Sequence, residues 1–322
     1  MNHWLITMGD FASSDGIIVC MAPQRDGCLR QMWTSRFALP ADRRVAGKGF
    51  TGAVFWSNDL IVAGFNGLYR IDSAGASCEP FLLRDDFNDL HDVSLAPAGS
   101  TVRFYVANTG LDCIVGVDEA GATRETIPLV PAKNGIPSSK NDPYFADEDM
   151  DKPVFLQKLR DTVHPNAVQA RAGDLWVSRF ADRCIERIGT RPARISVDGC
   201  PHDLVFADGW VWFTTTDGRV WRCAEEADEP MAELVVDTFG TTGRSGWVRG
   251  LALGDDGQLL LGFTRISRMP RERWTERPFA STETGILVVD ITTGEEVHWE
   301  SLDAVGSHPK VFSIVRCPES PP

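Results

Sequence analysis

Short runs in which apolar and polar residues alternate recur along the whole chain, and each run ends at a turn. The turns include six pairs with glycine in second place: Asn66-Gly67, Ala74-Gly75, Ala120-Gly121, Asp217-Gly218, Asp256-Gly257 and Thr293-Gly294. Alternating runs joined by such pairs are typical of β-hairpins. The pattern indicates no long amphipathic helix between them. It therefore predicts an all-β protein.

The runs fall into groups of four that repeat roughly every 40 residues. Five groups are continuous and span 49–85, 91–130, 164–198, 201–239 and 248–302. The sixth group is divided, with one run at 310–317 and the other three at 4–10, 16–23 and 29–35. Four strands per repeat at this period are typical of β-propeller blades.

The divided group predicts how the ring closes. Strands from both ends of the chain would share one blade, which pairs the first blade with the last and leaves no exposed sheet edge at the seam. A linear stack of repeats would not need such complementary ends. The sequence therefore predicts one domain over residues 1–322, a six-bladed β-propeller of four-stranded antiparallel blades.

The inner strand of each propeller blade lines the central channel, and its first residues lie at one mouth. Aligning the six inner runs by their apolar positions gives six equivalent first residues: Thr51, His91, His164, His202, Arg249 and Lys310. Three of the six histidines in the chain thus share one position in successive repeats. A slip of the register by two residues would place His308 in the ring instead of Lys310.

Three converging imidazoles predict a metal site at His91, His164 and His202. Neutral imidazole nitrogen binds divalent transition metals, and three protein ligands leave one position for water or substrate. Zinc is the predicted metal, with iron(II) or manganese as alternatives. Two other interpretations stay open: polar side chains that hydrogen-bond ordered water at the mouth, and a metal-free acid–base site.

Four cationic side chains are candidates for contacts with an anionic substrate. Arg249 and Lys310 are predicted to face the histidines across the channel and to bind a carboxylate or phosphate. The alternative is that they pair with acidic neighbours around the rim. Arg179 and Arg265 end second strands on the same face and are further candidates for this role.

Three polar residues follow the ring histidines closely. Asp92 and Asp203 each come directly after one of them, and adjacent residues of a strand point to opposite sides. We therefore expect both carboxylates to bond neighbouring strands, or to orient the imidazoles from behind, rather than to bind the metal. Asn166 lies two residues after His164 and is expected to point into the channel.

Two intervals between ring positions are longer than a blade requires. The extra residues, 131–163 and 267–284, predict lid-like insertions on the face that carries the ring. The first contains an acidic run with candidate bases, Asp147, Glu148 and Asp149. The second contains Trp274, a candidate cap over a ligand, whereas the tryptophans within strand patterns are expected to pack between blades.

Composition narrows the choice of partners. The formal net charge of −13 argues against nucleic acid and anionic membranes, because phosphate binding needs clustered Lys and Arg. No apolar run reaches 18 residues and no basic, apolar leader opens the chain, so we expect no membrane span and a cytoplasmic protein.

The eight cysteines form no CxxC pair and are expected to be reduced and mostly buried. The oligomeric state stays open.

Several common catalytic motifs are absent from the sequence. It contains no P-loop, no dinucleotide-binding glycine fingerprint, no nucleophile elbow and no HExxH helix. Nucleotide chemistry and nucleophilic triads are therefore not indicated.

The repeat pattern, above all HDVSLAPAGSTVRFYVANTGLDCIVGVDEAG at 91–121, resembles a group of six-bladed propellers. That group includes NHL-repeat proteins, gluconolactonase-like lactonases and peptidyl-hydroxyglycine amidating lyases. The amidating lyases hold zinc with three axial histidines, and His91, His164 and His202 look like comparable positions. The lactonases hold their metal with carboxylate and Asn ligands, and the ring here lacks those carboxylates. The chain also lacks the secretory and disulfide context of the amidating lyases, so neither specific activity is expected.

The resemblance and the ring together give a leading hypothesis and two alternatives. The leading hypothesis is a metal-dependent lyase or hydrolase that acts on a small anionic metabolite at the propeller axis. One alternative is a non-catalytic propeller that binds a peptide or protein. The other is a three-histidine non-haem iron oxygenase.

Overall fold

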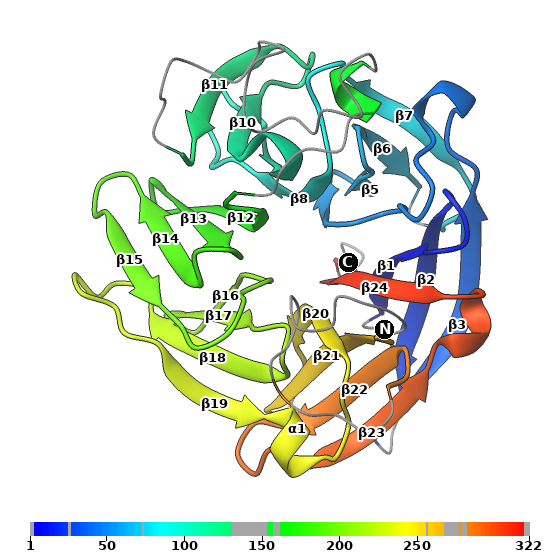
Figure 1. Cartoon of the computed structure of the whole chain (residues 1–322), viewed down its shortest axis with the longest axis vertical. Coiled ribbons are helices and arrows are strands. Elements are labelled where there is room, and N and C mark those ends of the chain that lie inside the picture. Colours follow the sequence, from blue (N-terminus) through cyan, green and yellow to red (C-terminus); the bar gives the residue numbers. More distant parts are fainter. Residues whose placement is uncertain are drawn as a thin grey trace.

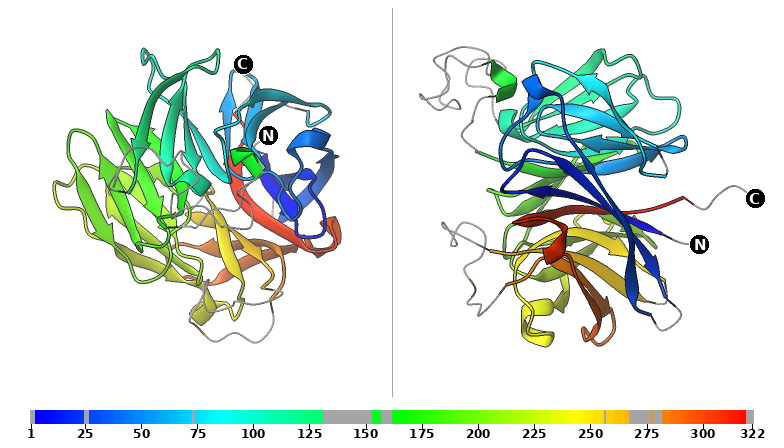
Figure 2. Two further views of the ribbon diagram at one scale, coloured as in Figure 1. Left: turned by 45° about the horizontal axis from the view of Figure 1, so that its top comes forward. Right: turned by 90° about the vertical axis from the view of Figure 1, so that its right-hand side faces the viewer.

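The computed structural model describes residues 3–24, 27–72, 74–130, 153–156, 162–255, 257–266, 277 and 282–318. Within them the chain forms six antiparallel four-stranded sheets arranged as blades around a central axis (Figure 1). This confirms the predicted six-bladed β-propeller. Figure 2 shows that both termini lie at the same end of that axis.

The blades are numbered here by their order in the chain, and their strands run from the axis outward. Blade 1 consists of β24 (Pro309–Arg316), β1 (Trp4–Asp10), β2 (Gly16–Pro23) and β3 (Leu29–Phe37). Blade 2 consists of β4 (Ala53–Trp56), β5 (Asp59–Ala63), β6 (Gly67–Ile71) and β7 (Cys78–Leu83). Blade 3 consists of β8 (Leu90–Leu95), β9 (Phe104–Asn108), β10 (Cys113–Val117) and β11 (Thr123–Pro128).

The remaining blades continue in the same order. Blade 4 consists of β12 (Pro165–Arg171), β13 (Asp174–Arg179), β14 (Cys184–Ile188) and β15 (Ala193–Ser196). Blade 5 consists of β16 (Val205–Ala207), β17 (Trp210–Thr214), β18 (Arg219–Ala224) and β19 (Glu233–Asp237). Blade 6 consists of β20 (Trp247–Leu253), β21 (Gln258–Thr264), β22 (Gly285–Asp290) and β23 (Glu296–Ser301).

Helical segments are short and lie in the connections. They are α1 (Thr238–Thr241) and the 3-10 turns η1 (Ala41–Arg43), η2 (Thr109–Leu111), η4 (Val154–Leu156) and η6 (Asp303–Val305). No helix within the described ranges is long and apolar enough to cross a membrane.

The two ends of the chain close the ring as predicted. β1 pairs antiparallel with β24 from Trp4 opposite Arg316 to Asp10 opposite Pro309. The Asp10 carboxylate strengthens this closure, because it accepts hydrogen bonds from the backbone N–H groups of Ser307 (2.9 Å) and His308 (3.1 Å). The blade that joins the termini is therefore tied both along the strands and at the loop before β24.

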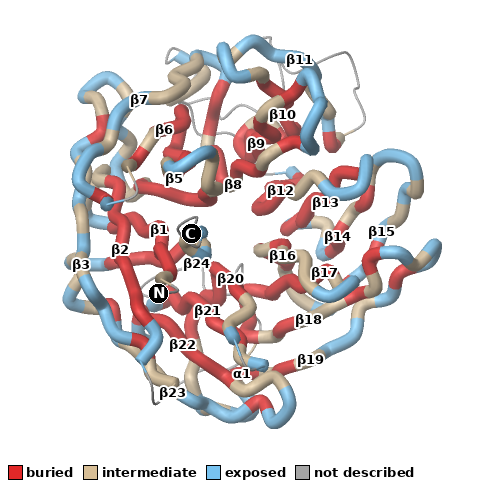
Figure 3. Tube along the Cα trace, turned by 180° about the vertical axis from the view of Figure 1, so that it is seen from behind, coloured by how far each residue is buried: buried red, intermediate tan, exposed pale blue. Residues whose placement is uncertain are grey.

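The core consists of six apolar clusters, one at each junction between neighbouring blades. Both faces of each sheet are thus covered, which explains why most inner and middle strands are largely buried; β4, β16 and β18 are mostly half-buried (Figure 3). Trp176 and Trp212 lie in two of these clusters and pack between blades, as predicted. All eight cysteines are free, and Cys20, Cys113, Cys184 and Cys223 are buried.

Hydroxyl groups join several blades to the inner strand of the next. Thr51 donates to the Leu90 carbonyl at 2.8 Å, and Ser178 donates to the His202 carbonyl at 2.7 Å. These bonds cross blade junctions at the level of the predicted ring. They fix the height of each inner strand relative to its neighbour, which positions the residues at the axis.

Candidate functional site

Irregularities of the inner strands place the ring residues at the axis. The pairing of β8 with β9 shifts between Leu90 and Asp92, so that His91 is the extra residue of a β-bulge. His164 lies just before β12 with a φ of 55°, and the Asp112 carboxylate accepts its backbone N–H at 2.9 Å. In blade 6 the register shifts between Val248 and Leu251, on either side of Arg249.

The structure brings the three predicted histidines together. The ring centroids of His91 and His164 lie 4.7 Å apart in an edge-on arrangement, and those of His91 and His202 lie 6.3 Å apart. All three are buried, as are Arg249 and Lys310. His308 is exposed, whereas Lys310 is buried.

Hydrogen bonds define the tautomers of two of these histidines. Asn166 donates its side-chain N–H to the Pro201 carbonyl (3.2 Å), so its Oδ1 accepts from the Nδ1 of His91 at 2.7 Å. The Nδ1 of His202 lies 3.3 Å from Oδ1 of Asp203. Burial lowers the pKa of His91 to about 3 and also lowers that of His202. Both rings are therefore neutral, with N–H at Nδ1 and a lone pair at Nε2.

The tautomers of His91 and His202 suit a metal ligand, but the ring nitrogens of the three histidines are not arranged around a common metal position. Metal-bound histidines usually donate their second ring nitrogen to a carboxylate or amide, as His91 and His202 do. Within the described parts of the chain, however, no three His, Cys, Asp or Glu side chains are grouped so that they could hold a metal ion. The Nε2 of His91 instead lies 3.5 Å from Oδ1 of Asp89.

A cationic cluster shares the axis with the histidines. Lys310 donates to the Gly47 carbonyl, and its Nζ lies 4.9 Å from the ring centroid of Phe312. The guanidinium of Arg249 lies 5.0 Å from the same ring. Lys48 forms an ion pair with Asp89, with Nζ and Oδ1 2.6 Å apart.

Burial lowers the pKa values of the two buried cations in this cluster, Arg249 and Lys310. Burial lowers the pKa of Arg249 to about 10. Burial, together with the neighbouring charges of Lys48 and Arg249, lowers the pKa of Lys310 well below its usual range. Burial alone would raise the pKa of Asp89, but Lys48 and His91 outweigh it and hold that pKa well below its ordinary value. The axis therefore holds cations that lack the hydration they would have at the surface.

Two of the arginines predicted to contact an anionic substrate, Arg179 and Arg265, form ion pairs with carboxylates of the protein. Arg179 binds Asp182 and Glu186 at 2.5 and 2.7 Å, and Arg265 pairs with Asp303. Their guanidinium groups hold loops at the rim of their blades. In the described arrangement neither is available to a ligand at the axis, because each would first have to leave its own ion pair.

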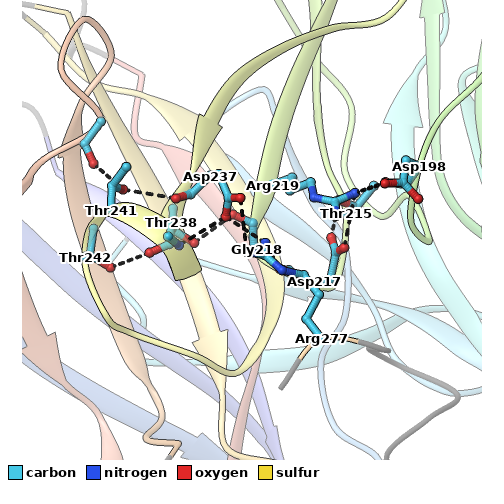
Figure 4. Close-up of polar contacts among 12 residues, drawn as sticks. Asp198, Thr215, Asp217, Gly218, Arg219, Asp237, Thr238, Thr241, Thr242 and Arg277 are labelled. Atoms are coloured by element: carbon cyan, nitrogen blue, oxygen red, sulfur yellow. Dashed lines mark hydrogen bonds and ion pairs between the residues drawn. The ribbon is translucent and has the colours of Figure 1, made fainter. Parts of the chain in front are cut away.

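Described pieces of the two predicted insertions lie against the loops of the blades. The side-chain amides of Asn66 and Asn88 donate to the carbonyls of Phe155 (3.1 Å) and Val154 (2.6 Å). Figure 4 shows Arg277 bound through both guanidinium nitrogens to the carboxylate of Asp237, at 2.7 and 3.0 Å. Residues 131–152, 157–161, 267–276 and 278–281 lie outside the described residues, together with four candidate residues: Asp147, Glu148, Asp149 and Trp274.

A cavity of about 700 Å³ occupies the axial channel. It extends from His91 and His202 along the inner strands to their carboxyl ends, where Arg171 and Arg316 line it. The histidines form part of its inner end. It therefore runs toward the end of the propeller that carries the termini, away from the face where the sequence placed the mouth.

Asp92 and Asp203 both line this cavity, which the simple alternation of a strand did not predict. The irregular backbone around His91 and His202 breaks the alternation, so that each aspartate shares the channel with its neighbouring histidine. Both also bond neighbouring blades as predicted: Asp92 accepts from the N–H of Val168 (2.9 Å) and Asp203 from that of Gly250 (2.9 Å). Burial raises the pKa of Asp92 to about 8.

Comparison with known proteins establishes the fold and leaves the family open. No protein-family model matches the chain, and no curated protein matches it. Among solved structures, a nidogen/laminin complex aligns over 98% of this chain and 98% of its own, with 11% identity and a TM-score of 0.62. A protein of unknown function from Bacteroides caccae aligns over 99% of both chains, with 12% identity and a TM-score of 0.62.

An enzyme is also among the structural neighbours. A luciferin-regenerating enzyme aligns over 82% of this chain and 78% of its own, with 12% identity and a TM-score of 0.54. The neighbours are thus both enzymes and binding proteins. At these identities the likeness shows the fold alone.

Proposed function

We propose that the axial ring binds a small anionic metabolite and acts on it as a lyase or hydrolase. The observation that carries the proposal is the gathering of Lys48, Arg249 and Lys310 at the axis. The described contacts of Lys310 are a backbone carbonyl and aromatic rings, which stabilise an ammonium less than a carboxylate does. A bound carboxylate or phosphate would add a negative charge beside the ammonium of Lys310.

The neutral histidines provide proton transfer next to that anion. The Nδ1–H of His91 is held by Asn166, which leaves Nε2 as the proton acceptor. A proton taken up at Nε2 would be stabilised by Asp89, 3.5 Å away. A bound anion would also favour the protonated form and raise the pKa of His91 from its low value toward neutrality.

A metal-dependent form of the same site is the second candidate, and the tautomers of His91 and His202 favour it. His91, His164 and His202 would hold the ion after their side chains turn toward a common point. When bound, the metal would act as a Lewis acid toward a substrate oxygen. The nearby cations weigh against it, because they would repel a divalent ion unless an anionic ligand enters with it.

Anion binding tests the proposal directly. Inorganic phosphate and citrate are titrated into the parent protein by calorimetry, beside Arg249→Met and Lys310→Met. We expect binding in the parent that weakens at least tenfold in each variant. Arg265→Met is the matched control, because it removes a rim arginine paired with Asp303 and should leave binding unchanged. Equal binding by all four proteins would refute an anion site at the axis.

Metal content separates the two candidates. Elemental analysis is made on the purified parent and on folded His91→Ala, His164→Ala and His202→Ala variants. Near-stoichiometric metal that each variant loses would favour the metal-dependent form, and its identity would distinguish zinc from iron or manganese. If the parent holds no metal after reconstitution, the second candidate fails, while the anion titration still decides the first.

A further inference from the structure

The axial cavity has a chemistry opposite to that of the cationic ring. Its walls are inner-strand residues that expose polar and apolar surface in about equal parts, and they include the aromatic side chains of Phe55, Phe206 and Phe312. Its inner end carries two carboxylates, Asp92 and Asp203. A cavity of about 700 Å³ is within the range of small-molecule sites.

Phe312 separates the cavity from the cations of the ring. Its ring centroid lies 4.9 Å from Nζ of Lys310 and 5.0 Å from the guanidinium carbon of Arg249, and neither cation lines the cavity. The cations that do line it, Arg171 and Arg316, lie at the outer end. Both are paired there, with Glu225 at 3.0 Å and with Asp255 at 2.8 Å.

The inner end offers hydrogen-bond acceptors. The Nδ1–H of His202 faces the carboxylate of Asp203, which leaves the lone pair of Nε2 as an acceptor. His202 is 3% exposed, and among the described residues its Nε2 has no hydrogen-bond partner. A buried acceptor without a donor costs about 1 to 3 kcal/mol of stability, so a ligand N–H there would be favourable. The side chain of Asp203 beside it is 12% exposed.

From these features we infer that the axial cavity binds a small primary amine, with its ammonium group at Asp203 and His202 and an apolar tail along the channel. An ammonium would add N–H donors and a positive charge beside the Asp203 carboxylate, which now accepts from the side chains of His202 and Thr214 and the N–H of Gly250. Aromatic rings nearby add favourable contacts with a cation. An anion would meet the carboxylate of Asp203 at the inner end, and a fully apolar molecule would leave the His202 acceptor unsatisfied.

Calorimetric titration with three probes of equal length tests the inference: hexylamine hydrochloride, hexanol and sodium hexanoate, at neutral pH. We expect hexylammonium to bind at least tenfold more tightly than hexanol, and hexanoate to bind most weakly. If hexanol or hexanoate binds as tightly as hexylammonium, the inference is wrong.

Two variants locate the site. Asp203→Asn removes the charge at the inner end, and Ser313→Trp fills the channel from β24. Each should weaken hexylammonium binding at least tenfold. Asp198→Asn is the matched control, because it removes an exposed carboxylate paired with Arg219 outside the cavity. Unchanged binding in a folded Ser313→Trp would overturn the assignment even if Asp203→Asn does not fold. This test is independent of the proposed anion site, which is tested with variants of Arg249 and Lys310 and with phosphate and citrate as probes.

Discussion

Arg187 offers the sharpest test of how the blades are held together. Its side chain is 1% exposed and donates to three backbone carbonyls of blade 5, those of Glu225 (3.1 Å), Ala227 (3.0 Å) and Asp228 (3.4 Å). Its guanidinium also lies over the ring of Trp176, 5.2 Å from the centroid. A cation from blade 4 thus binds a turn of blade 5.

The substitution Arg187→Met removes these donors while filling much of the volume. These three carbonyls and that of Arg191, which also accepts from Arg187, lose a partner at about 1 kcal/mol each, and the loss of the cation–π contact adds about 0.5 to 1 kcal/mol. We therefore expect the free energy of unfolding to fall by about 4 to 5 kcal/mol. Arg187→Lys should lose less, because a lysine keeps the charge and reaches some of the carbonyls.

Guanidinium chloride unfolding, followed by tryptophan fluorescence, measures the change. The control is Arg171→Met, which removes an arginine from the same junction. Its side chain is 56% exposed and pairs with Glu225, so its loss should cost less than about 1 kcal/mol. Equal losses in the two variants would refute the claim that the buried carbonyl contacts of Arg187 hold these blades together.

Three further predictions rest on individual contacts. Asp10→Ala should lower the free energy of unfolding by about 2 to 3 kcal/mol, because the carboxylate accepts two N–H groups of the loop before β24. A loss no larger than that caused by Asp15→Ala would contradict this role of Asp10. A double-mutant cycle on Arg277→Ala and Asp237→Ala, measured by thermal unfolding, should give a coupling of about 1 kcal/mol for their two-point ion pair, and strictly additive losses would argue against that pair. A thiol reagent at pH 8 should leave Cys113 and Cys223 unmodified in the native protein, because burial raises each thiol pKa to about 12; labelling of either, located by peptide mass analysis, would show that its blade opens.

The fold could be predicted from the sequence because its cause is repeated and local. Alternation and glycine turns define each blade, and the divided group at 4–35 and 310–317 matches the pairing of β1 with β24. The same alignment found the three histidines that the structure brings together. It worked because equivalent strand starts meet at one level of a closed ring.

The chemistry around the ring was less predictable, for two physical reasons. The bulge at His91 breaks strand alternation, so the position of Asp92 in the channel could not follow from a period of two. Lys48 and Asp89 lie in connections before inner strands, where no periodicity applies. Their only signal is a charged residue two or three places before a ring position. The ion pairs that occupy Arg179 and Arg265 also depend on loop geometry, which alternation does not encode.

The closing blade has a consequence for how the protein is made. Within the propeller, strands β1, β2 and β3 are synthesised before the other strands, but their inner partner β24 follows some 300 residues later. Until then β1 presents an unpaired edge, and blade 1 cannot complete its junctions. Bringing such distant segments together is the slowest kind of contact for a chain to form. Blade 1 can therefore be completed only after β24 has been synthesised. Until then the unpaired edge of β1 is the part of the nascent chain most prone to pair with another molecule.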